Sequence, residues 1–196
     1  SAGKIVRVIA LICGGGSALL PAPAPGLTLE DKAAVNRLLL ANGFEITEIN
    51  LSRQQLSRLK GGGMLRLAAP APVTGYILSD VIGDDLRTIA SGPTVAPLGS
   101  RAEARDLLKA RGLWDDLPAP VRAHLEAAAP PALPSAPARN YLIGSNRVSL
   151  AAVTAACGPT AQISNDRLTG DVEAAAAEII TAATSAQSAA ACLVFG

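Results

Sequence analysis

Short apolar runs alternate along this chain with longer segments of helical periodicity, and this alternation constrains the fold most. The runs, rich in aliphatic and β-branched residues, cover residues 5–13, 72–79, 141–144, 160–164 and 191–195. The helical segments cover residues 28–43, 47–60, 100–112, 145–157 and 171–183. Strands separated by helices of this length form parallel sheets. The pattern predicts an α/β fold with a mainly parallel, three-layer, Rossmann-like sheet that carries helices on both faces.

Capping residues mark where several of these helices begin and end. Thr28 with Asp31, and Ser100 with Glu103, have the spacing of a capping box, and Gly43 and a later glycine suit helix ends. Residues 118–138 are rich in Ala and Pro. We expect this stretch to be a connecting segment with one short helix near residues 121–128.

Composition excludes several classes of partner. The 17 basic and 16 acidic residues give a net charge of +1, with no basic block, so nucleic acid is not an expected partner. No apolar run approaches the roughly 20 residues of a membrane helix, so we expect no membrane partner. The 3 cysteines have no paired spacing and lie in apolar stretches. They predict buried thiols rather than a disulfide framework or a zinc site, which fits a cytoplasmic protein.

A glycine turn follows the first apolar run. Gly14, Gly15 and Gly16 allow a close approach of the backbone, and Ser17 adds a hydroxyl. Successive N–H groups in such a turn can bind an anion. The sequence matches neither the P-loop nor the dinucleotide fingerprint. A purely structural tight turn therefore stays nearly as good an interpretation.

A polar stripe follows from the spacing of Asn50, Arg53, Ser57 and Lys60. Steps of three, four and three residues place these side chains on one face of the helix expected at residues 47–60. The stripe holds two cations and would suit an anionic substrate. Spacing alone favours the alternative, in which the stripe is the solvated face of an amphipathic helix.

Three aspartates, Asp80, Asp84 and Asp85, follow the second apolar run. Carboxylates at the end of a parallel strand are typical ligands of Mg²⁺, and one of them could instead accept a proton from a substrate hydroxyl. Ser91 adds a hydroxyl in the turn that follows. Asp and Gly are also common turn residues, so turn chemistry explains the segment equally well.

A third strand-to-helix junction contains Gly144, Ser145 and Asn146. The start of the following helix could bind an anion, but helix capping by Ser145 or Asn146 is the better interpretation of these residues alone. The single histidine, His124, lies in the Ala/Pro-rich segment, where we expect a surface position. This expectation disfavours a histidine general base and a Ser-His triad.

Four segments in fixed order carry a family resemblance. The segments GGGSALLPAPAPGLTLEDK, EINLSRQQLSRLKGG, SDVIGDDLRTIASGPT and LIGSNRVSLAA together resemble the glycerate 2-kinase family, also called the MOFRL family. Its members are often labelled hydroxypyruvate reductase. The resemblance implies a cytoplasmic, two-domain α/β enzyme with its active site in the cleft between the domains. It also implies transfer of the ATP γ-phosphate to the 2-hydroxyl of D-glycerate with Mg²⁺, giving 2-phosphoglycerate.

The chain departs from the family pattern in length. Family members are about twice as long, so the resemblance implies truncation at both ends and absence of the C-terminal MOFRL domain. The first four residues, SAGK, resemble a trace of an N-terminal family motif that contains an important lysine. Cys13 occupies a position that resembles a serine position in many members. Activity of this piece alone, and a homodimeric state, stay open.

The resemblance gives the candidate residues their roles. The turn from Gly14 to Ser17 would cradle a phosphate or the glycerate carboxylate, and Asn50, Ser57, Ser91 and the 144–146 junction would contact substrate or phosphate. Lys60 and Arg53 would neutralise the transferred group. Asp80, Asp84 or Asp85 would bind Mg²⁺, or Asp80 would act as the base. This mechanism requires the glycine turn, the polar stripe and the aspartate segment to converge in space.

Two other functions stay open at this point. An NADH-dependent hydroxypyruvate reductase would need a dinucleotide site, and no G-x-G-x-x-G follows a strand. An inactive fragment, or one that acts only as a binding scaffold, is the third possibility.

Overall fold

The computed structural model describes residues 6–128, 135–159, 161–165, 169–185 and 192–195. The chain divides into two compact units, residues 1–143 and 144–196. Each unit is described by itself.

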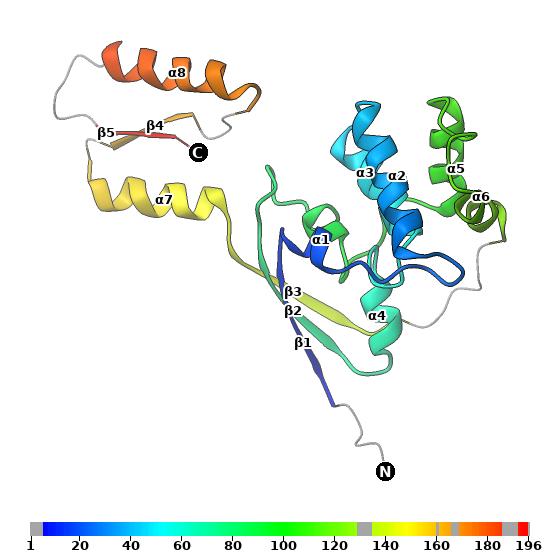
Figure 1. The fold of residues 1–196 in the computed structure, drawn as a ribbon. Helices are drawn as coiled ribbons and strands as arrows, with labels where there is room; N and C mark the ends of the chain where they lie inside the picture. Colours follow the sequence, from blue (N-terminus) through cyan, green and yellow to red (C-terminus); the bar gives the residue numbers. More distant parts are fainter. Residues whose placement is uncertain (1–5, 129–134, 160, 166–168, 186–191, 196) are drawn as a thin grey trace. The chain divides into compact units, whose positions relative to one another are not determined.

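The first unit contains a three-stranded parallel sheet in the order β1-β2-β3 (Figure 1). Its strands are β1 (Val8–Cys13), β2 (Val73–Leu78) and β3 (Ala138–Gly144). β1 and β2 pair without a register shift, from Val8 opposite Val73 to Cys13 opposite Leu78. The three predicted strands are confirmed, and β3 begins three residues before the apolar run that indicated it.

Within the described residues of the first unit, helices cover only one face of this sheet. Ala10, Ile12 and Ile77 point to the covered face and are buried, whereas Ile9 and Leu11 are 65% and 81% exposed. The prediction of helices on both faces is therefore wrong for this unit. Every residue of β1 is apolar, so its sequence could not distinguish a strand covered on both faces from one covered on a single face.

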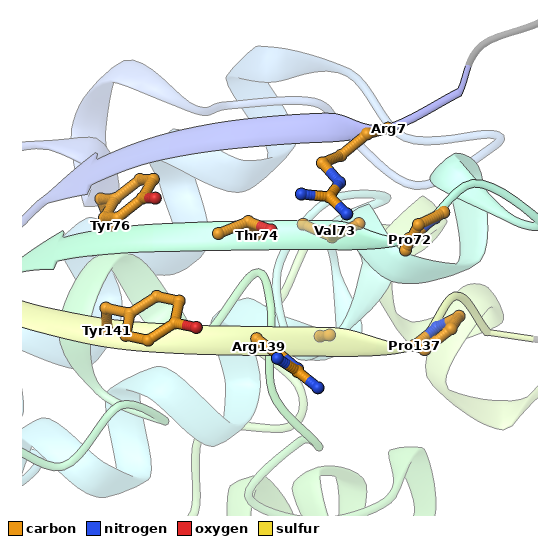
Figure 2. Close-up of a pocket in the computed structure, with 9 residues that line it drawn as sticks. Arg7, Pro72, Val73, Thr74, Tyr76, Pro137, Arg139 and Tyr141 are labelled. Carbon is orange, nitrogen blue, oxygen red and sulfur yellow. The ribbon is translucent and has the colours of Figure 1, made fainter.

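The open face carries a shallow pocket (Figure 2). Tyr76 and Tyr141 stack there with ring centroids 5.6 Å apart. Arg7 and Arg139 lie farther along the strands and complete a pocket of about 430 Å³. The aromatic and basic side chains of this face thus lie side by side across strands distant in sequence.

Two hydrophobic cores hold the first unit together. One joins the helices α2 (Leu29–Ala41), α3 (Ile46–Gln55), α5 (Arg101–Ala110) and α6 (Ala119–Glu126) through buried aliphatic residues such as Leu39 and Leu108. The other packs the covered sheet face against η1 (Ile89–Ser91) and α4 (Gly63–Ala68). Both cores are built almost entirely from aliphatic side chains, as the low aromatic content requires.

Both predicted capping boxes are present. The Thr28 hydroxyl accepts from the Asp31 amide at 3.1 Å, and the Asp31 carboxylate accepts from the Thr28 amide at 2.8 Å. Ser100 and Glu103 form the same reciprocal pair at the start of α5. These short-range bonds explain why sequence alone located the two helix starts.

The helix predicted at residues 47–60 ends early, at Gln55. The chain then pairs with the proline-rich segment at residues 21–25. The Ala24 amide donates to the Leu56 carbonyl at 3.0 Å, and the Arg58 amide donates to the Ala22 carbonyl at 2.9 Å. This antiparallel contact replaces the last turn of the expected helix. The short helices α1 (Gly16–Leu19), α4 and η1 were not predicted.

The second unit contains α7 (Asn146–Cys157), β4 (Ala161–Asn165), α8 (Val172–Ser185) and β5 (Cys192–Phe195). β4 and β5 pair in parallel as a separate two-stranded sheet. All four elements lie where the sequence predicted them.

Two further expectations about side chains are corrected. Cys13 and Cys157 are exposed thiols rather than buried ones. His124 is half-buried rather than a surface residue, and its Nε2 lies 2.9 Å from the Gln55 carbonyl oxygen. Among the residues described, no helix combines the length and apolar character needed to cross a membrane.

Candidate functional site

A buried amine joins three segments that are far apart in sequence. Lys60 is only 2% exposed, and its Nζ donates to the Ser17 carbonyl at 2.7 Å and to the Ser91 hydroxyl at 3.3 Å. The Ser91 hydroxyl in turn donates to Asn50 Oδ1 at 2.8 Å. The glycine turn, α3 and the segment after β2 therefore converge at Lys60, as the mechanism requires.

Local backbone contacts fix the position of Lys60. The Ser57 hydroxyl accepts from the amides of Leu59 and Lys60 at 3.3 and 3.4 Å. Immediately after Lys60, the amides of Gly61 and Gly62 donate to the carbonyls of Ser91 and Gly92, at 3.0 and 2.8 Å. A Cβ at Gly62, whose φ is +74°, would lie 2.8 Å from the Val95 carbonyl oxygen. Glycine is therefore required where these two loops meet.

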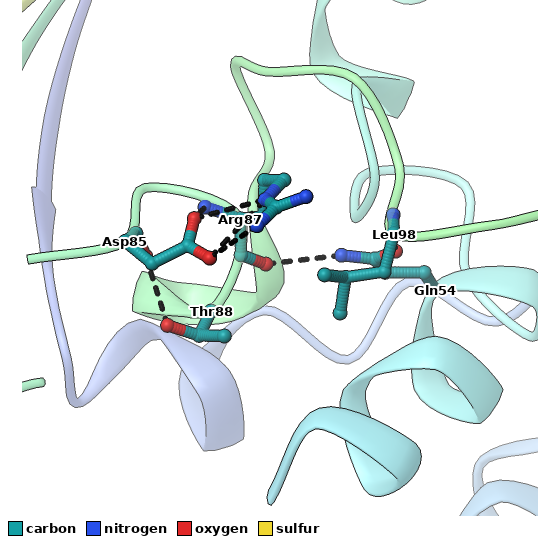
Figure 3. A network of polar contacts seen from close by, with 5 residues as sticks. All are labelled: Gln54, Asp85, Arg87, Thr88 and Leu98. Atoms are coloured by element: carbon teal, nitrogen blue, oxygen red, sulfur yellow. Dashed lines mark hydrogen bonds and ion pairs between the residues drawn. The ribbon is translucent and has the colours of Figure 1, made fainter. Parts of the chain in front are cut away.

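The segment before Ser91 has an unusual backbone. Ala90 and Ser91 both have positive φ, 51° and 61°, in the left-handed region that non-glycine residues rarely adopt. Gln54 holds this segment in place (Figure 3). Its Nε2 donates to the carbonyls of Arg87 and Ser91 at 3.0 and 3.2 Å, and its Oε1 accepts from the Leu98 amide at 2.8 Å. Strain of this kind persists only where surrounding contacts enforce it, and it is common at functional sites.

Two further cations, Lys32 and Arg53, lie near the buried amine of Lys60. Burial, and then the positive charges of Lys32 and Arg53, lower the pKa of Lys60 to about 8. Burial, and then Arg53, lower the pKa of Lys32 to about 8 as well. Lys32 donates to the Pro21 carbonyl, and Arg53 donates through Nε to Asn36 Oδ1 at 2.9 Å. None of the three forms an ion pair within the part of the chain that the structure describes.

This cationic cluster, Lys32, Arg53 and Lys60, would be stabilised by an anion. Sequence analysis identified Arg53 and Lys60 but missed Lys32. No sequence pattern indicated Lys32, because its position near Lys60 depends on the fold. The segment at residues 21–25, which contacts both Lys32 and the turn after α3, brings the two lysines together. Both lysines share the depressed pKa, which is typical of basic groups held together in functional sites.

Asp80 lies directly against the glycine turn. A Cβ at Gly14 would fall 1.6 Å from Asp80 Oδ2 and 1.8 Å from its Cγ, so no larger residue fits beside this carboxylate. Gly16 is similarly close to η1, because a Cβ there would lie 3.0 Å from the Ala90 Cβ. Glycine is therefore required in this turn because the loop that contains Asp80 and Ala90 packs directly against it.

The three aspartates are not equivalent. The Asp85 carboxylate pairs with Arg87, with Oδ2 2.8 Å from Nη2, and this bond to Arg87 lowers the pKa of Asp85 (Figure 3). Asp84 occupies a left-handed turn position with φ of 56°. Within the described ranges, no three His, Cys, Asp or Glu side chains form a group that could hold a metal ion. The aspartates therefore do not form a preassembled three-carboxylate site, and Asp80 is the one that contacts the glycine turn.

A domain family described as "Domain of unknown function (DUF4147)" matches residues 1–126. Curated relatives of this chain carry the name glycerate kinase. The chain belongs to the glycerate kinase family. The family resemblance found in the four sequence segments is thereby confirmed.

Individual relatives support the assignment at substantial identity. Glycerate kinase of Macaca fascicularis is 44% identical over 86% of this chain and 44% of its own length. A protein of Agrobacterium vitis that carries the name hydroxypyruvate reductase is also 44% identical, over 84% of this chain and 43% of its own length. The crystal structure of glycerate kinase from Thermotoga maritima matches 97% of this chain and 47% of that chain, with a TM-score of 0.79 and 29% identity. The chain thus spans less than half the length of these relatives.

The polar stripe differs from both sequence interpretations. Asn50, Ser57 and Lys60 are buried, so the stripe is not a solvated helix face. Nor is it one helix face, since only Asn50 and Arg53 lie on α3. The Ser57 hydroxyl donates to the Ala22 carbonyl at 3.3 Å and accepts from the Lys60 amide, so it supports the turn that carries Lys60 rather than the cationic side chains themselves.

The remaining predicted residues, Gly144, Ser145 and Asn146, lie in the second unit. The Ser145 hydroxyl accepts from the Val148 amide at 3.3 Å and caps α7. Capping, the interpretation favoured by the residues themselves, is confirmed for Ser145. In the described part of the family domain, the predicted residues that converge are those of the glycine turn, Asn50, Arg53, Lys60, Asp80 and Ser91.

Proposed function

We propose that this chain forms part of an ATP-dependent glycerate kinase that phosphorylates the 2-hydroxyl of glycerate. The observation that carries the proposal is the buried Lys60, bonded to the glycine turn and to Ser91 and accompanied by Lys32 and Arg53. Phosphoryl transfer depends mainly on positioning and on neutralising negative charge. A partly buried cluster of cations beside a glycine turn fits that requirement.

Each group of the site would have a defined task. Lys60 and Arg53 would stabilise charge on the transferred phosphoryl group, and the N–H groups of the glycine turn would bind a phosphate or the glycerate carboxylate. Asn50 and Ser91 would hold the Lys60 amine in position. Gln54 would keep the Ser91 segment in its left-handed conformation.

The acidic loop has enough carboxylates to bind one magnesium ion. Mg²⁺ takes few protein carboxylates and completes its shell with water and phosphate oxygens, so Asp80, with Asp84 in the same loop, would suffice as protein ligands. Bound there, the ion would neutralise phosphate charge. If Asp80 instead accepts the proton of the 2-hydroxyl, its contact with Gly14 still fixes the position of its carboxylate.

A direct assay separates the kinase from the reductase. The chain would be incubated with ATP and D-glycerate, and separately with hydroxypyruvate and NADH, while ADP formation and NADH loss are followed. We expect ADP and 2-phosphoglycerate in the first incubation, and no NADH oxidation in the incubation with hydroxypyruvate. NADH oxidation without kinase activity would support the reductase name that some relatives carry. The L-enantiomer of glycerate serves as a third arm.

Substitution of Lys60 tests the proposed site. Lys60→Met retains the apolar stem and removes the charge, and we expect kcat to fall by about 10³-fold, the effect of losing one well-placed charge-stabilising group. Lys109→Met, on the exposed side of α5, is the matched control and should retain full activity. Equal activity of the two variants would show that Lys60 has no role in transfer. If the chain alone has no activity, the same pair is compared in a full-length relative.

A further inference from the structure

A second set of basic side chains lines a cavity in the first unit. Arg58, Arg66, Arg101 and His124 surround a volume of about 610 Å³, together with the hydroxyl residues Ser57 and Ser100. They come from the turn after α3, from α4, from the start of α5 and from α6. The volume is within the usual range for a small-molecule site.

Among the residues that the structure describes, no acidic side chain lines the cavity beside these arginines. None of its lining residues is Asp or Glu. Arg66 donates to the Gly61 carbonyl at 3.3 Å, and Arg101 donates to the carbonyls of Ala127 and Ala128, both at 3.3 Å. Glu103, near the rim, accepts from the Ser100 amide at 2.6 Å and so belongs to the cap of α5. The cavity therefore has an excess of positive charge.

The cavity is not lined by the cationic cluster of the proposed kinase site. Lys60 does not line it, and the Lys60 amine is bonded to Ser17 and Ser91 instead. The two sites are adjacent. Gln54, which donates to the Ser91 carbonyl, and Ser57, which accepts from the Lys60 amide, also line the cavity, whereas the three cationic side chains of the cluster do not. An anion at one site therefore need not contact the other.

His124 lies in the wall of the cavity and senses its charge. Its Nε2 is 2.9 Å from the Gln55 carbonyl oxygen, which anchors the ring. Burial lowers the pKa of His124. The bond with the Gln55 carbonyl raises it in part, and the positive charge of Arg101 lowers it by a smaller amount. Arg58, Arg66 and Arg101 are the charged groups that line the same cavity. A bound anion would offset their charge and favour the imidazolium form.

We propose that this cavity is a binding site for a small, multiply charged oxyanion of the class of phosphorylated small molecules. Guanidinium groups match the geometry of phosphate oxygens and bind them through paired hydrogen bonds. Three guanidiniums without a carboxylate partner suit a phosphate dianion better than a single carboxylate. This site goes beyond the kinase function and does not depend on it.

The single histidine of the chain makes the site directly observable. Pyrophosphate is titrated into the full chain, and sodium chloride is reduced at each step so that the ionic strength stays constant. The Cε1–H resonance of His124 is followed by NMR. We expect a saturable shift of this resonance and a rise in the His124 pKa. No shift, or an equal shift with chloride alone, would overturn the proposal.

Variants assign the effect to the cavity. Arg58→Ala and Arg66→Ala, both at exposed positions, should each weaken pyrophosphate binding about tenfold, the usual effect of losing one charge-assisted hydrogen bond. Arg37→Ala, which removes an arginine from an exposed pair on α2, is the matched control and should bind as the parent does. Circular dichroism checks that each variant is folded.

Lys60→Met separates this site from the kinase site. The His124 response to pyrophosphate should persist in this variant even if kinase activity is lost. If Lys60→Met abolishes the response while the Arg58 and Arg66 variants retain it, pyrophosphate binds at the cationic cluster and the proposal is wrong. Loss of kinase activity in every assay would leave the His124 result unaffected.

Discussion

The two faces of the β1-β2-β3 sheet carry similarly apolar side chains but have different surroundings. On one face, Ile12 and Ile77 are buried beneath η1, α4 and the loops that hold Lys60. On the other, Leu11 and Tyr76 remain exposed. Tyr76 lines the pocket that also contains Arg7 and Arg139 (Figure 2). Hydrophobicity along a strand therefore predicts the strand but not which of its faces is covered. The covered face also supports the segment that ends at Ser91, so core packing and the candidate site are coupled there.

Neighbouring residues of β2 give the strongest test of this difference. Ile77→Ala should lower the free energy of unfolding by about 3 kcal/mol, because it leaves a cavity in the buried core. Leu78→Ala, one position along the strand and 49% exposed, should cost less than about 1 kcal/mol. Urea denaturation of both variants measures the two values. Equal losses would contradict the assignment of the faces.

A smaller effect is expected from the polar support of the covered face. Gln54→Ala removes three hydrogen bonds and leaves the Arg87 and Ser91 carbonyls and the Leu98 amide without this partner. We expect a loss of about 2 kcal/mol in the free energy of unfolding, the range for unsatisfied buried groups. Gln55→Ala, which loses only the bond from its Nε2 to the Gly99 carbonyl, is the control. A larger loss in the control would show that Gln54 is not the main support.

The depressed lysine pKa values predict a dependence of stability on pH. The folded-state pKa of Lys60 and Lys32 is about 8, below the 10.5 of the unfolded chain, so between these values the unfolded state binds more protons. The contribution of these groups to stability should therefore rise with pH from about 8 to 10.5, by at most about 1.4 kcal/mol per pH unit for each lysine. Chemical denaturation at several pH values measures the slope. Lys60→Met should reduce it, and an unchanged slope would contradict the burial of this amine.

The smallest effect is expected on the open face. Leu11→Ser replaces a side chain that is 81% exposed, and we expect a change of less than about 0.5 kcal/mol. Ile12→Ser, the buried neighbour on β1, serves as the contrast and should be severely destabilising. A large loss for Leu11→Ser would mean that this face is covered when the chain is in solution.

The parts of the fold that depend on local sequence were predictable. The capping boxes at Thr28 and Ser100 involve residues three positions apart, and strands β1 and β2 are continuous apolar runs. In the candidate site, the residue types were predictable but their grouping was only partly so. Lys60 and Asp80 were identified, whereas Lys32 and Gln54 were missed because their partners lie in distant segments. Asp85 was grouped with Asp80 although Arg87, two residues away, engages it.

The sequence by itself determined the order of strands and helices, the helix caps and the family to which the chain belongs. These properties depend on residue type and short spacing. Only the tertiary structure decided that α3 ends at Gln55, that the polar stripe is buried, and that the sheet is covered on one face. Each of these depends on contacts between segments more than 30 residues apart, such as Pro23 with Ser57 and Gly14 with Asp80. Such contacts combine backbone hydrogen bonds with the burial of apolar surface, and a pattern along one segment cannot specify which segments meet.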